Sequence, residues 1–132
     1  MPALNSNLRI NGDRLWDSLM EMAKIGPGIE GGNNRQTLTD EDAEGRALFQ
    51  NWCETAGCTM GLDQMGNMFA TRPGSDPEAL PVYVGSHLDT QPTGGKYDGI
   101  LGVLGWLEII NTLNDLNIKT KHPIVVTNWT NE

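Results

Sequence analysis

Positively charged residues are scarce in this sequence. Its 132 residues include 9 lysines and arginines against 17 aspartates and glutamates, which gives a formal net charge of −8. Nucleic-acid backbones and anionic membrane surfaces repel a chain of this charge that has no basic patch. We therefore expect no nucleic acid and no membrane among its partners.

Cysteines and long apolar runs are also scarce. Cys53 and Cys58 are the only cysteines, and a C-x4-C pair without a second pair is a weak zinc signal. We interpret both as packing residues of a reduced protein. No window approaches 18 consecutive apolar residues, and residues 1–14 lack the long apolar stretch of a signal peptide. These absences predict a cytoplasmic location.

What the chain does contain is enough apolar residues for one folded domain. Hydrophobic residues make up 38% of it, and its 4 tryptophans are spread along its length. A chain of this length is at most one domain. It stops directly after the strand-like run "IVVTNWTNE", whereas domains usually end in a solvated polar tail. We therefore expect a truncated chain, which would be aggregation-prone because a strand edge and an apolar helix face stay uncovered.

Two amphipathic helices are predicted in the first half of the chain. Asn11 or Asp13 is a plausible N-cap of the first, which Gly26-Pro27 would stop. Thr39 can cap the second, and Gly57 is a natural residue to follow its end. The predicted buried face of the second helix consists of Ala43, Ala47, Leu48 and Trp52.

The second half alternates strands and a helix. A hairpin is predicted around Met65-Gly66-Asn67 by its turn residues. It is followed by the strand "VYVGS", the strongly apolar helix "DGILGVLGWLEIINTLNDLN" and the strand "HPIVVTNWT". Strand, crossover helix and strand form a βαβ unit with parallel strands, and a helix this apolar should be buried on more than one side. The fold class is therefore α/β.

Polar side chains follow both strands of the predicted βαβ unit. His87 and Asp89 come after the first strand, Asp98 precedes the helix, and Glu132 follows the last strand. Ligands bind beyond the carboxyl ends of strands in open α/β sheets, so we expect these side chains to converge there. Gln91 and Asn128 lie near this position and are candidates for substrate contact.

An imidazole with several carboxylates suits Zn²⁺, Mn²⁺ or Co²⁺, and a carboxylate can bridge two such ions to activate water for hydrolysis. The alternative is purely structural. A histidine after a strand is often a capped surface residue, and an aspartate before a helix is often only a cap. His122, which precedes the last strand, is expected to lie far from this edge and to have no chemical role.

A longer pattern resembles a known family. The run "GSHLDTQPTGGKYDGILGVLG", followed by "PIVVTNWTNE", is similar to the amidase, hydantoinase and carbamoylase branch of the dinuclear zinc aminopeptidase-like hydrolases. That branch includes N-carbamoyl-L-amino-acid hydrolase, beta-ureidopropionase and allantoate amidohydrolase. The resemblance extends over nearly the whole chain. It implies a zinc-aminopeptidase-like mixed sheet with flanking helices, of which residues 1–132 would be the N-terminal portion of the catalytic domain.

The resemblance also implies roles for the four polar residues. His87 would ligate one metal ion, Asp98 would bridge two, Asp89 would support His87 from behind, and Glu132 would be the general base. The cofactors would be two divalent ions, zinc or alternatively manganese, cobalt or nickel. Further ligands and the groups that bind the substrate carboxylate belong to later sequence and to an inserted dimerisation domain, both absent here, so this chain alone is expected to be inactive.

The implied activity is hydrolysis of a carbon-nitrogen bond in a linear amide or ureido compound, with an N-carbamoyl-L-amino acid as substrate and a homodimer as the full-length protein. Two alternatives remain open. The parent could be a metallo-aminopeptidase or dipeptidase of the same fold, or the short chain could be a non-catalytic interaction module.

Overall fold

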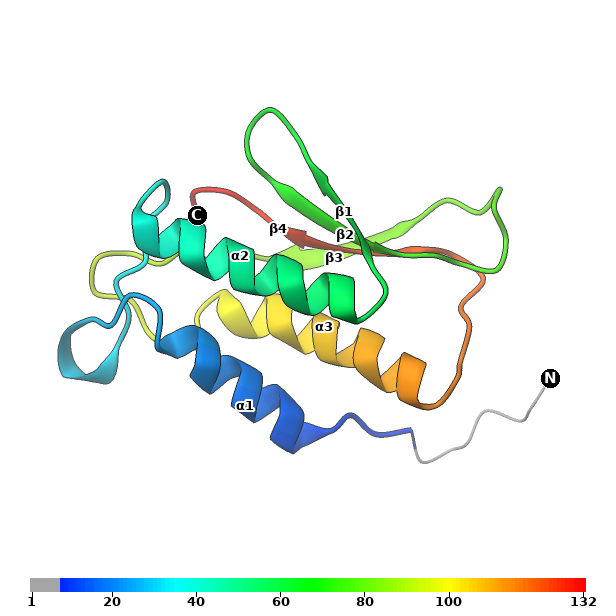
Figure 1. The fold of residues 1–132 in the computed structure, drawn as a ribbon, viewed down its shortest axis with the longest axis horizontal. Coiled ribbons are helices and arrows are strands. Elements are labelled where there is room, and N and C mark those ends of the chain that lie inside the picture. The colour runs from blue at the N-terminus through cyan, green and yellow to red at the C-terminus, as the bar shows by residue number, and fades with distance from the viewer. Residues whose placement is uncertain (1–7) are drawn as a thin grey trace.

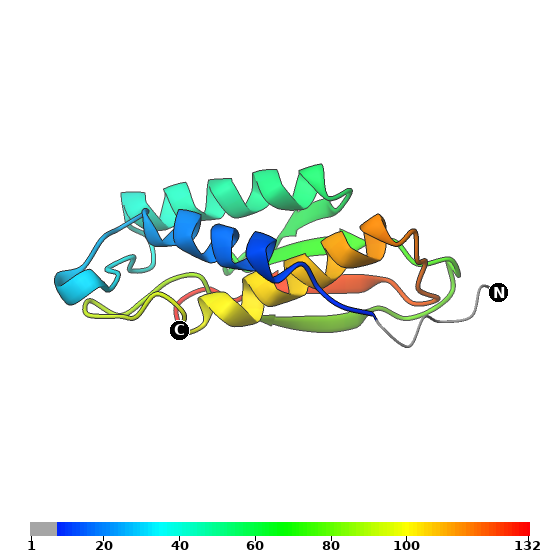
Figure 2. The same ribbon diagram turned by 90° about the horizontal axis from the view of Figure 1, so that it is seen from below.

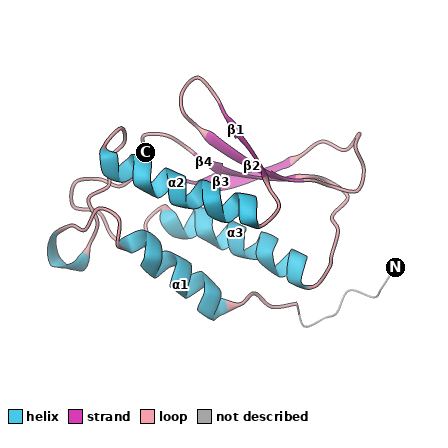
Figure 3. Cartoon of the chain, in the orientation of Figure 1, coloured by secondary structure: helices cyan, strands magenta, loops and turns pink. Residues whose placement is uncertain are grey.

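Three helices and a mixed sheet form the protein in a computed structural model that describes residues 8–132. The helices are α1 (Gly12–Ala23), α2 (Asp40–Thr55) and α3 (Ile100–Asp115), with a short 3-10 turn, η1 (Ile29–Gly31), between the first two. The strands are β1 (Thr59–Leu62), β2 (Met68–Arg72), β3 (Val82–Ser86) and β4 (Ile124–Asn128). Figure 3 distinguishes the helices from the strands by colour. Residues 1–7, part of the segment without a signal-peptide pattern, lie outside the described residues.

The sheet has the strand order β1-β2-β4-β3. β1 and β2 form the predicted antiparallel hairpin, β2 pairs with β4 in antiparallel orientation, and β3 pairs with β4 in parallel orientation. The crossover from β3 to β4 runs through α3 (Figure 1), so the predicted βαβ unit is confirmed. The parallel register pairs Ser86 with Asn128, and both strands therefore end at the same edge of the sheet.

Local signals in the sequence account for the helix ends. The Asn11 side chain accepts a hydrogen bond from the Arg14 amide at 3.0 Å, so Asn11 is the N-cap of α1. The Thr39 hydroxyl caps α2 by accepting from the Asp42 amide at 3.2 Å. Gly57, with φ of 87°, follows the end of α2 in the left-handed region that favours glycine. These caps match the predicted ones.

The predicted buried face of α2 is wrong in part. Ala43 and Ala47 are exposed, and Leu48 and Trp52 are only half-buried. The buried residues of α2 are Asp42, Gly45, Phe49 and Cys53. Burying Phe49 removes much more apolar surface from water than burying two alanines, and this difference favours the observed rotation of the helix.

All three helices lie on one face of the sheet (Figure 2). α3 contacts α1, β3 and β4, which confirms that it is buried on more than one side. Cys53 and Cys58 are unpaired and buried in the core, as predicted. The core under the helices also contains large apolar residues from each layer, among them Met22, Phe49, Leu104, Ile110 and Val126.

The opposite face of the sheet carries an aromatic cluster. Phe69 lies edge-to-face with Tyr83 and with Trp129, at ring-centroid distances of 6.3 and 6.0 Å. Tyr83 is 60% exposed and Trp129 is 47% exposed. The expected uncovered apolar surface therefore lies mainly on the sheet instead of on α3. The aggregation expected of this chain stays a prediction.

Candidate functional site

The segments that follow β3 and β4 run side by side at the carboxyl edge of the sheet. The Trp129 amide donates to the Ser86 carbonyl at 2.8 Å, which continues the pairing past the strand ends. Beyond this bond, residues 87–90 and 129–132 form two neighbouring loops. His87 and Asp89 lie on the first loop and Glu132 on the second, at the sheet edge where the sequence predicted them.

His87 has one ring nitrogen committed to a hydrogen bond and one with no hydrogen-bond partner among the described residues. Its Nδ1 lies 2.8 Å from the carbonyl oxygen of Asp89, so Nδ1 is the protonated nitrogen that donates to it. This tautomer leaves the Nε2 lone pair available as a ligand. The ring side chain is 14% exposed, which suits a ligand on the wall of a site better than the capped surface residue of the alternative interpretation.

Asp98 lies near His87 because the next residue, Gly99, contacts the imidazole ring. Gly99 packs so closely on the imidazole that a Cβ atom there would lie 2.2 Å from the ring. Its φ of 79° is also in the left-handed region. The exposed Asp98 thus immediately precedes a residue in contact with the His87 ring, just before α3 begins.

Asp89 is buried, at 4% exposure, and its two oxygens have different surroundings. Oδ2 accepts hydrogen bonds from the Thr37 hydroxyl at 2.8 Å and from the Glu132 amide at 3.1 Å. Oδ1 lies 3.8 Å from His87 Nδ1 and has no hydrogen-bond partner among the described residues. The carboxylate therefore lies beside His87, while the main-chain carbonyl of Asp89 makes the hydrogen bond that orients the ring.

Glu132 is held by its backbone. Besides the bond from its amide to Asp89, the Thr130 amide donates to Asn67 Oδ1 at 2.8 Å. Asn131, between these two anchored amides, has a φ of 64°. Within residues 8–132 no three or more His, Cys, Asp or Glu side chains gather closely enough to hold a metal ion. The expected convergence of an imidazole and three carboxylates into one ligand set is not observed, because the Asp89 carboxylate is turned toward Thr37 and the Glu132 backbone.

Asn128 has a different function from the expected one. It is 2% exposed, and its Oδ1 accepts a hydrogen bond from the Leu88 amide at 2.9 Å. It therefore shapes the loop instead of facing a substrate. Gln91 is exposed at the end of this loop. His122 precedes β4 at the opposite end of the strand, where the sequence predicted it, and its Nδ1 lies 2.7 Å from the Leu80 carbonyl.

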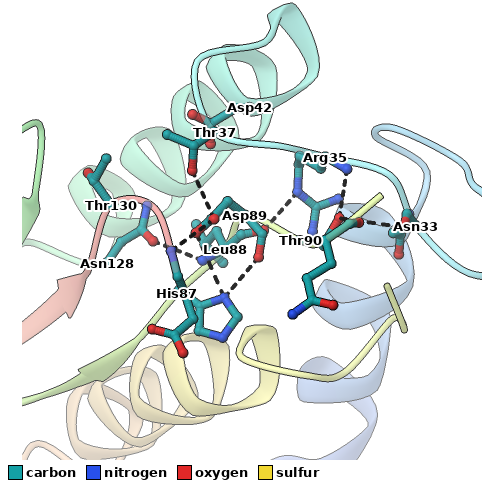
Figure 4. Close-up of polar contacts among 12 residues, drawn as sticks. Asn33, Arg35, Thr37, Asp42, His87, Leu88, Asp89, Thr90, Asn128 and Thr130 are labelled. Carbon is teal, nitrogen blue, oxygen red and sulfur yellow. Dashed lines mark hydrogen bonds and ion pairs between the residues drawn. The ribbon is translucent and has the colours of Figure 1, made fainter. Parts of the chain in front are cut away.

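Residues 33–37, in the segment that leads to α2, form hydrogen bonds to the His87 loop (Figure 4). Arg35 is 1% exposed and donates from Nε to the Leu88 carbonyl at 2.9 Å. Its Nη1 donates to the carbonyls of Met22 and Ile25 at 3.1 and 2.6 Å. The Arg35 amide donates to Thr90 Oγ1, and the Thr90 amide donates to the Arg35 carbonyl, both at 2.7 Å. We call residues 33–37 the brace segment.

Burial shifts the pKa values of two charged groups in this region. Burial lowers the pKa of the Arg35 guanidinium, against the opposing effect of the negative charges of Asp42 and Asp89. Burial also raises the pKa of the Asp42 carboxyl, whose Oδ2 accepts from the Leu38 amide at 3.0 Å. A lone arginine in an Asn- and Gly-rich loop was the one sequence signal that could have identified the brace segment.

Comparisons with known proteins agree with this geometry. The chain is 75% identical, over its whole length, to an N-carbamoyl-L-amino-acid amidohydrolase from Rhizobium meliloti, of which it covers 32%. Over 98% of its length it is 33% identical to a ureidoglycolate hydrolase from Arabidopsis thaliana, of which it covers 27%. The chain thus spans about a third of the length of the curated relatives it matches. No family model matches it.

Solved structures share the fold. A hydantoinase/carbamoylase family amidase from Burkholderia ambifaria superposes with a TM-score of 0.93 at 54% identity, over 95% of this chain and 31% of that one. An aminopeptidase from Bacillus cereus, at 20% identity, has a TM-score of 0.73 over 92% of this chain and 37% of that one. The second match shows the fold alone, and together they confirm the predicted α/β, aminopeptidase-like fold class. By sequence and by fold, the chain matches the corresponding part of hydantoinase/carbamoylase family amidases, as its motifs predicted.

Proposed function

We propose that the protein hydrolyses a carbon-nitrogen bond of a linear ureido compound, with an N-carbamoyl-L-amino acid as substrate. The observation that carries this proposal is the 75% identity, over the whole chain, to an N-carbamoyl-L-amino-acid amidohydrolase. The likeness to a ureidoglycolate hydrolase favours the wider ureido class as a second candidate. Both compounds contain a ureido group, so one reaction type covers them.

The site would form part of a divalent metal centre, to which later sequence would add further ligands. His87 offers a free Nε2 because Nδ1 is committed to the Asp89 carbonyl. Asp98 follows a glycine-rich loop and immediately precedes Gly99, the residue packed on that ring, so its backbone lies beside the His87 loop at the start of α3. His87 would hold one ion and Asp98 would contribute to both ions of a pair, zinc or alternatively manganese, cobalt or nickel. Such ions, when bound, lower the pKa of water and stabilise developing negative charge on oxygen.

The chain's own residues account for the proton transfers. The Glu132 carboxylate would accept a proton from the attacking water and later deliver it to the leaving nitrogen. Its backbone is fixed at two points, through Thr130 and through its own amide, so the side chain begins from a defined position. The Asp89 carboxylate would act on this base through the Glu132 amide, and it lies beside His87 without accepting a hydrogen bond from the ring.

The domain organisation and the oligomeric state of the complete protein are also proposals. Residues 1–132 would be the N-terminal portion of a catalytic domain, and the complete protein would carry an inserted dimerisation domain and form a homodimer. The relatives' greater length supports this division. A cytoplasmic location stays a prediction. None of the helices in residues 8–132 has the length and apolar character needed to span a membrane.

A hybrid enzyme tests the function. Residues 1–132 would replace the matching segment of the Rhizobium meliloti relative, and the purified hybrid would be assayed on N-carbamoyl-L-amino acids, ureidoglycolate, allantoate and dipeptides. Turnover of the carbamoyl compounds is expected. Turnover of dipeptides alone would favour the aminopeptidase alternative. A folded, metal-loaded hybrid without turnover on any of these compounds would favour the non-catalytic interaction module.

Substitutions in the hybrid test the roles. Glu132→Gln should lower kcat by a factor of about 10² to 10⁴ and leave metal content unchanged, because only the proton acceptor is lost. Asp98→Ala should lower the metal content itself, measured by elemental analysis. Glu78→Gln, on an exposed loop, is the matched control and should change neither quantity. Activity that survives Glu132→Gln would show that another group is the base.

A further inference from the structure

Thr37 lies between the brace segment and the proposed base. Its hydroxyl donates to Asp89 Oδ2 at 2.8 Å, and the same oxygen accepts the Glu132 amide at 3.1 Å. Thr37 and Asp89 are 52 residues apart in sequence, and Asp89 and Glu132 are 43 apart. Three distant segments therefore meet at one carboxylate oxygen, which is shielded from water because Asp89 is buried.

The brace segment gives Thr37 a fixed position. Arg35, two residues before it, is hydrogen-bonded to carbonyls at the end of α1 and to the Leu88 carbonyl. Thr39, two residues after it, caps α2. Thr37 is thus anchored on both sides, and its hydroxyl reaches Asp89 from a rigid support (Figure 4). A hydroxyl held in this way fixes the rotation of the carboxylate that it bonds.

We propose that Thr37 is a positioning residue for Glu132, acting through the Asp89 carboxylate. The inference rests on the proposed function in so far as Glu132 is the base. Without the Thr37 hydroxyl, Asp89 Oδ2 keeps one donor instead of two and the carboxylate is free to rotate. The Glu132 amide then loses an acceptor of fixed orientation, and the Glu132 side chain is no longer held in one position. Thr37 itself touches neither the substrate nor a reacting atom.

Thr112 provides a matched control. Its hydroxyl donates at 2.9 Å to Glu108 Oε1, so it forms the same type of bond as Thr37, a threonine hydroxyl to a buried carboxylate. Both threonines are half-buried. Thr112 lies in the last turns of α3, on the side of α1, away from the His87 loop. Thr37→Val and Thr112→Val therefore remove equivalent bonds at two different places.

The first experiment measures amide hydrogen exchange by NMR in the 132-residue chain itself. Thr37→Val should speed exchange of the Glu132 amide about tenfold, the size expected for one hydrogen bond. The Thr130 amide, anchored separately on Asn67, should be unaffected, and Thr37→Ser should restore the slow exchange. Unchanged Glu132 exchange in Thr37→Val would overturn the proposal.

The second experiment measures kinetics in the hybrid enzyme. Thr37→Val should lower kcat about tenfold with KM within about twofold, since the base is displaced while the substrate contacts stay. Thr37→Ser should recover the rate, and Thr112→Val should leave it unchanged. A kcat for Thr37→Val no lower than that of Thr112→Val would refute the positioning role. If the unsubstituted hybrid has no turnover, the proposed function fails, and amide exchange alone decides for or against the contact.

Discussion

Two buried polar clusters of this protein differ in how completely their groups are paired. Between α1 and α3, Glu108 accepts from the Arg14 side chain at 2.7 Å through each carboxylate oxygen, and also from the Asn11 amide and Thr112. Around the brace segment, by contrast, Asn33 Oδ1, Arg35 Nη2 and Asp89 Oδ1 are buried with no hydrogen-bond partner among the described residues. A fully paired cluster stabilises the fold, whereas unpaired buried groups cost stability and mark a region shaped by another requirement.

The position of the clusters explains the contrast. The Arg14 cluster joins two helices far from the carboxyl edge of the sheet, and its only task is to hold them together. The brace segment lies behind His87 and Glu132, where the position of backbone groups decides whether the site works. The Arg35 guanidinium gives all its hydrogen bonds to neutral carbonyls and none to a carboxylate. It fixes the path of the backbone without a hydrogen bond to Asp42 or Asp89, whose negative charges act on it only through space.

Removal of Arg35 should have the largest effect on stability. Arg35→Met removes the three hydrogen bonds that the guanidinium donates to the buried carbonyls of Met22, Ile25 and Leu88, and each lost bond costs about 1 kcal/mol. We expect the free energy of unfolding, measured with urea, to fall by about 3 kcal/mol. Arg14→Met, in the half-exposed cluster, is the control and should cost less. An equal loss in both variants would remove the distinction between the clusters.

The two clusters should respond to pH with opposite sign. Burial raises the pKa of Asp42 above its ordinary 3.8, so its contribution favours the fold at low pH and is lost as the pH rises through the folded value. Burial alone would raise the pKa of Glu108 too, but the hydrogen bonds from Arg14, Asn11 and Thr112 outweigh it and lower that pKa below 4.5. The stability due to Glu108 is therefore present above that pH and lost as the pH falls through the folded value.

Urea titrations at several pH values check this difference. Relative to the unsubstituted chain, Asp42→Asn should gain stability as the pH rises from 3 toward 7, because the asparagine lacks the carboxyl whose raised pKa makes the unsubstituted fold lose stability over this range. Glu108→Gln should lose relative stability over the same range. If the relative stabilities of the two variants changed with pH in the same direction, this result would contradict the opposite pKa shifts of Asp42 and Glu108.

The smallest effect is expected at an exposed ion pair that belongs to neither cluster. Lys24 Nζ lies 2.5 Å from Glu21 Oε1, with side chains 69% and 54% exposed. Lys24→Ala should change the free energy of unfolding by less than about 0.5 kcal/mol, because water and salt screen such pairs. This variant sets the baseline against which the losses of unfolding free energy in Arg35→Met and Arg14→Met are compared. If Lys24→Ala lowered the free energy of unfolding as much as Arg14→Met does, the exposed ion pair and the Arg14 cluster would contribute equally to stability.

Local signals predicted much of the fold. The caps Asn11 and Thr39, the hairpin turn and the βαβ unit each depend on a few adjacent residues or on one period, and all are confirmed. The predicted buried face of α2 was wrong because the orientation of this helix depends on the residues that pack against Phe49. The positions of His87 and Asp89 at the sheet edge followed from the rule for parallel strands.

The brace segment could not be predicted in this way. Its contacts to residues 88–90 join positions more than 50 apart in sequence, and no short pattern specifies them. The role of Asp89 was predicted only in outline for the same reason. Its carboxylate stands beside His87, but its hydrogen bonds depend on Thr37 and Glu132, which two other segments supply. The assignments of metal ligands and of the base stay predictions.

The contact between Gly99 and His87 also bears on how this loop can evolve. A side chain at position 99 meets two obstacles at once, a left-handed backbone with φ of 79° and the imidazole ring 2.2 Å from the place of its Cβ. Position 95, in the same loop, has no atom within 4 Å of a Cβ placed there. A side chain can therefore be introduced at Gly95 without a clash, whereas glycine at position 99 should be retained in any library selected for an intact His87 site.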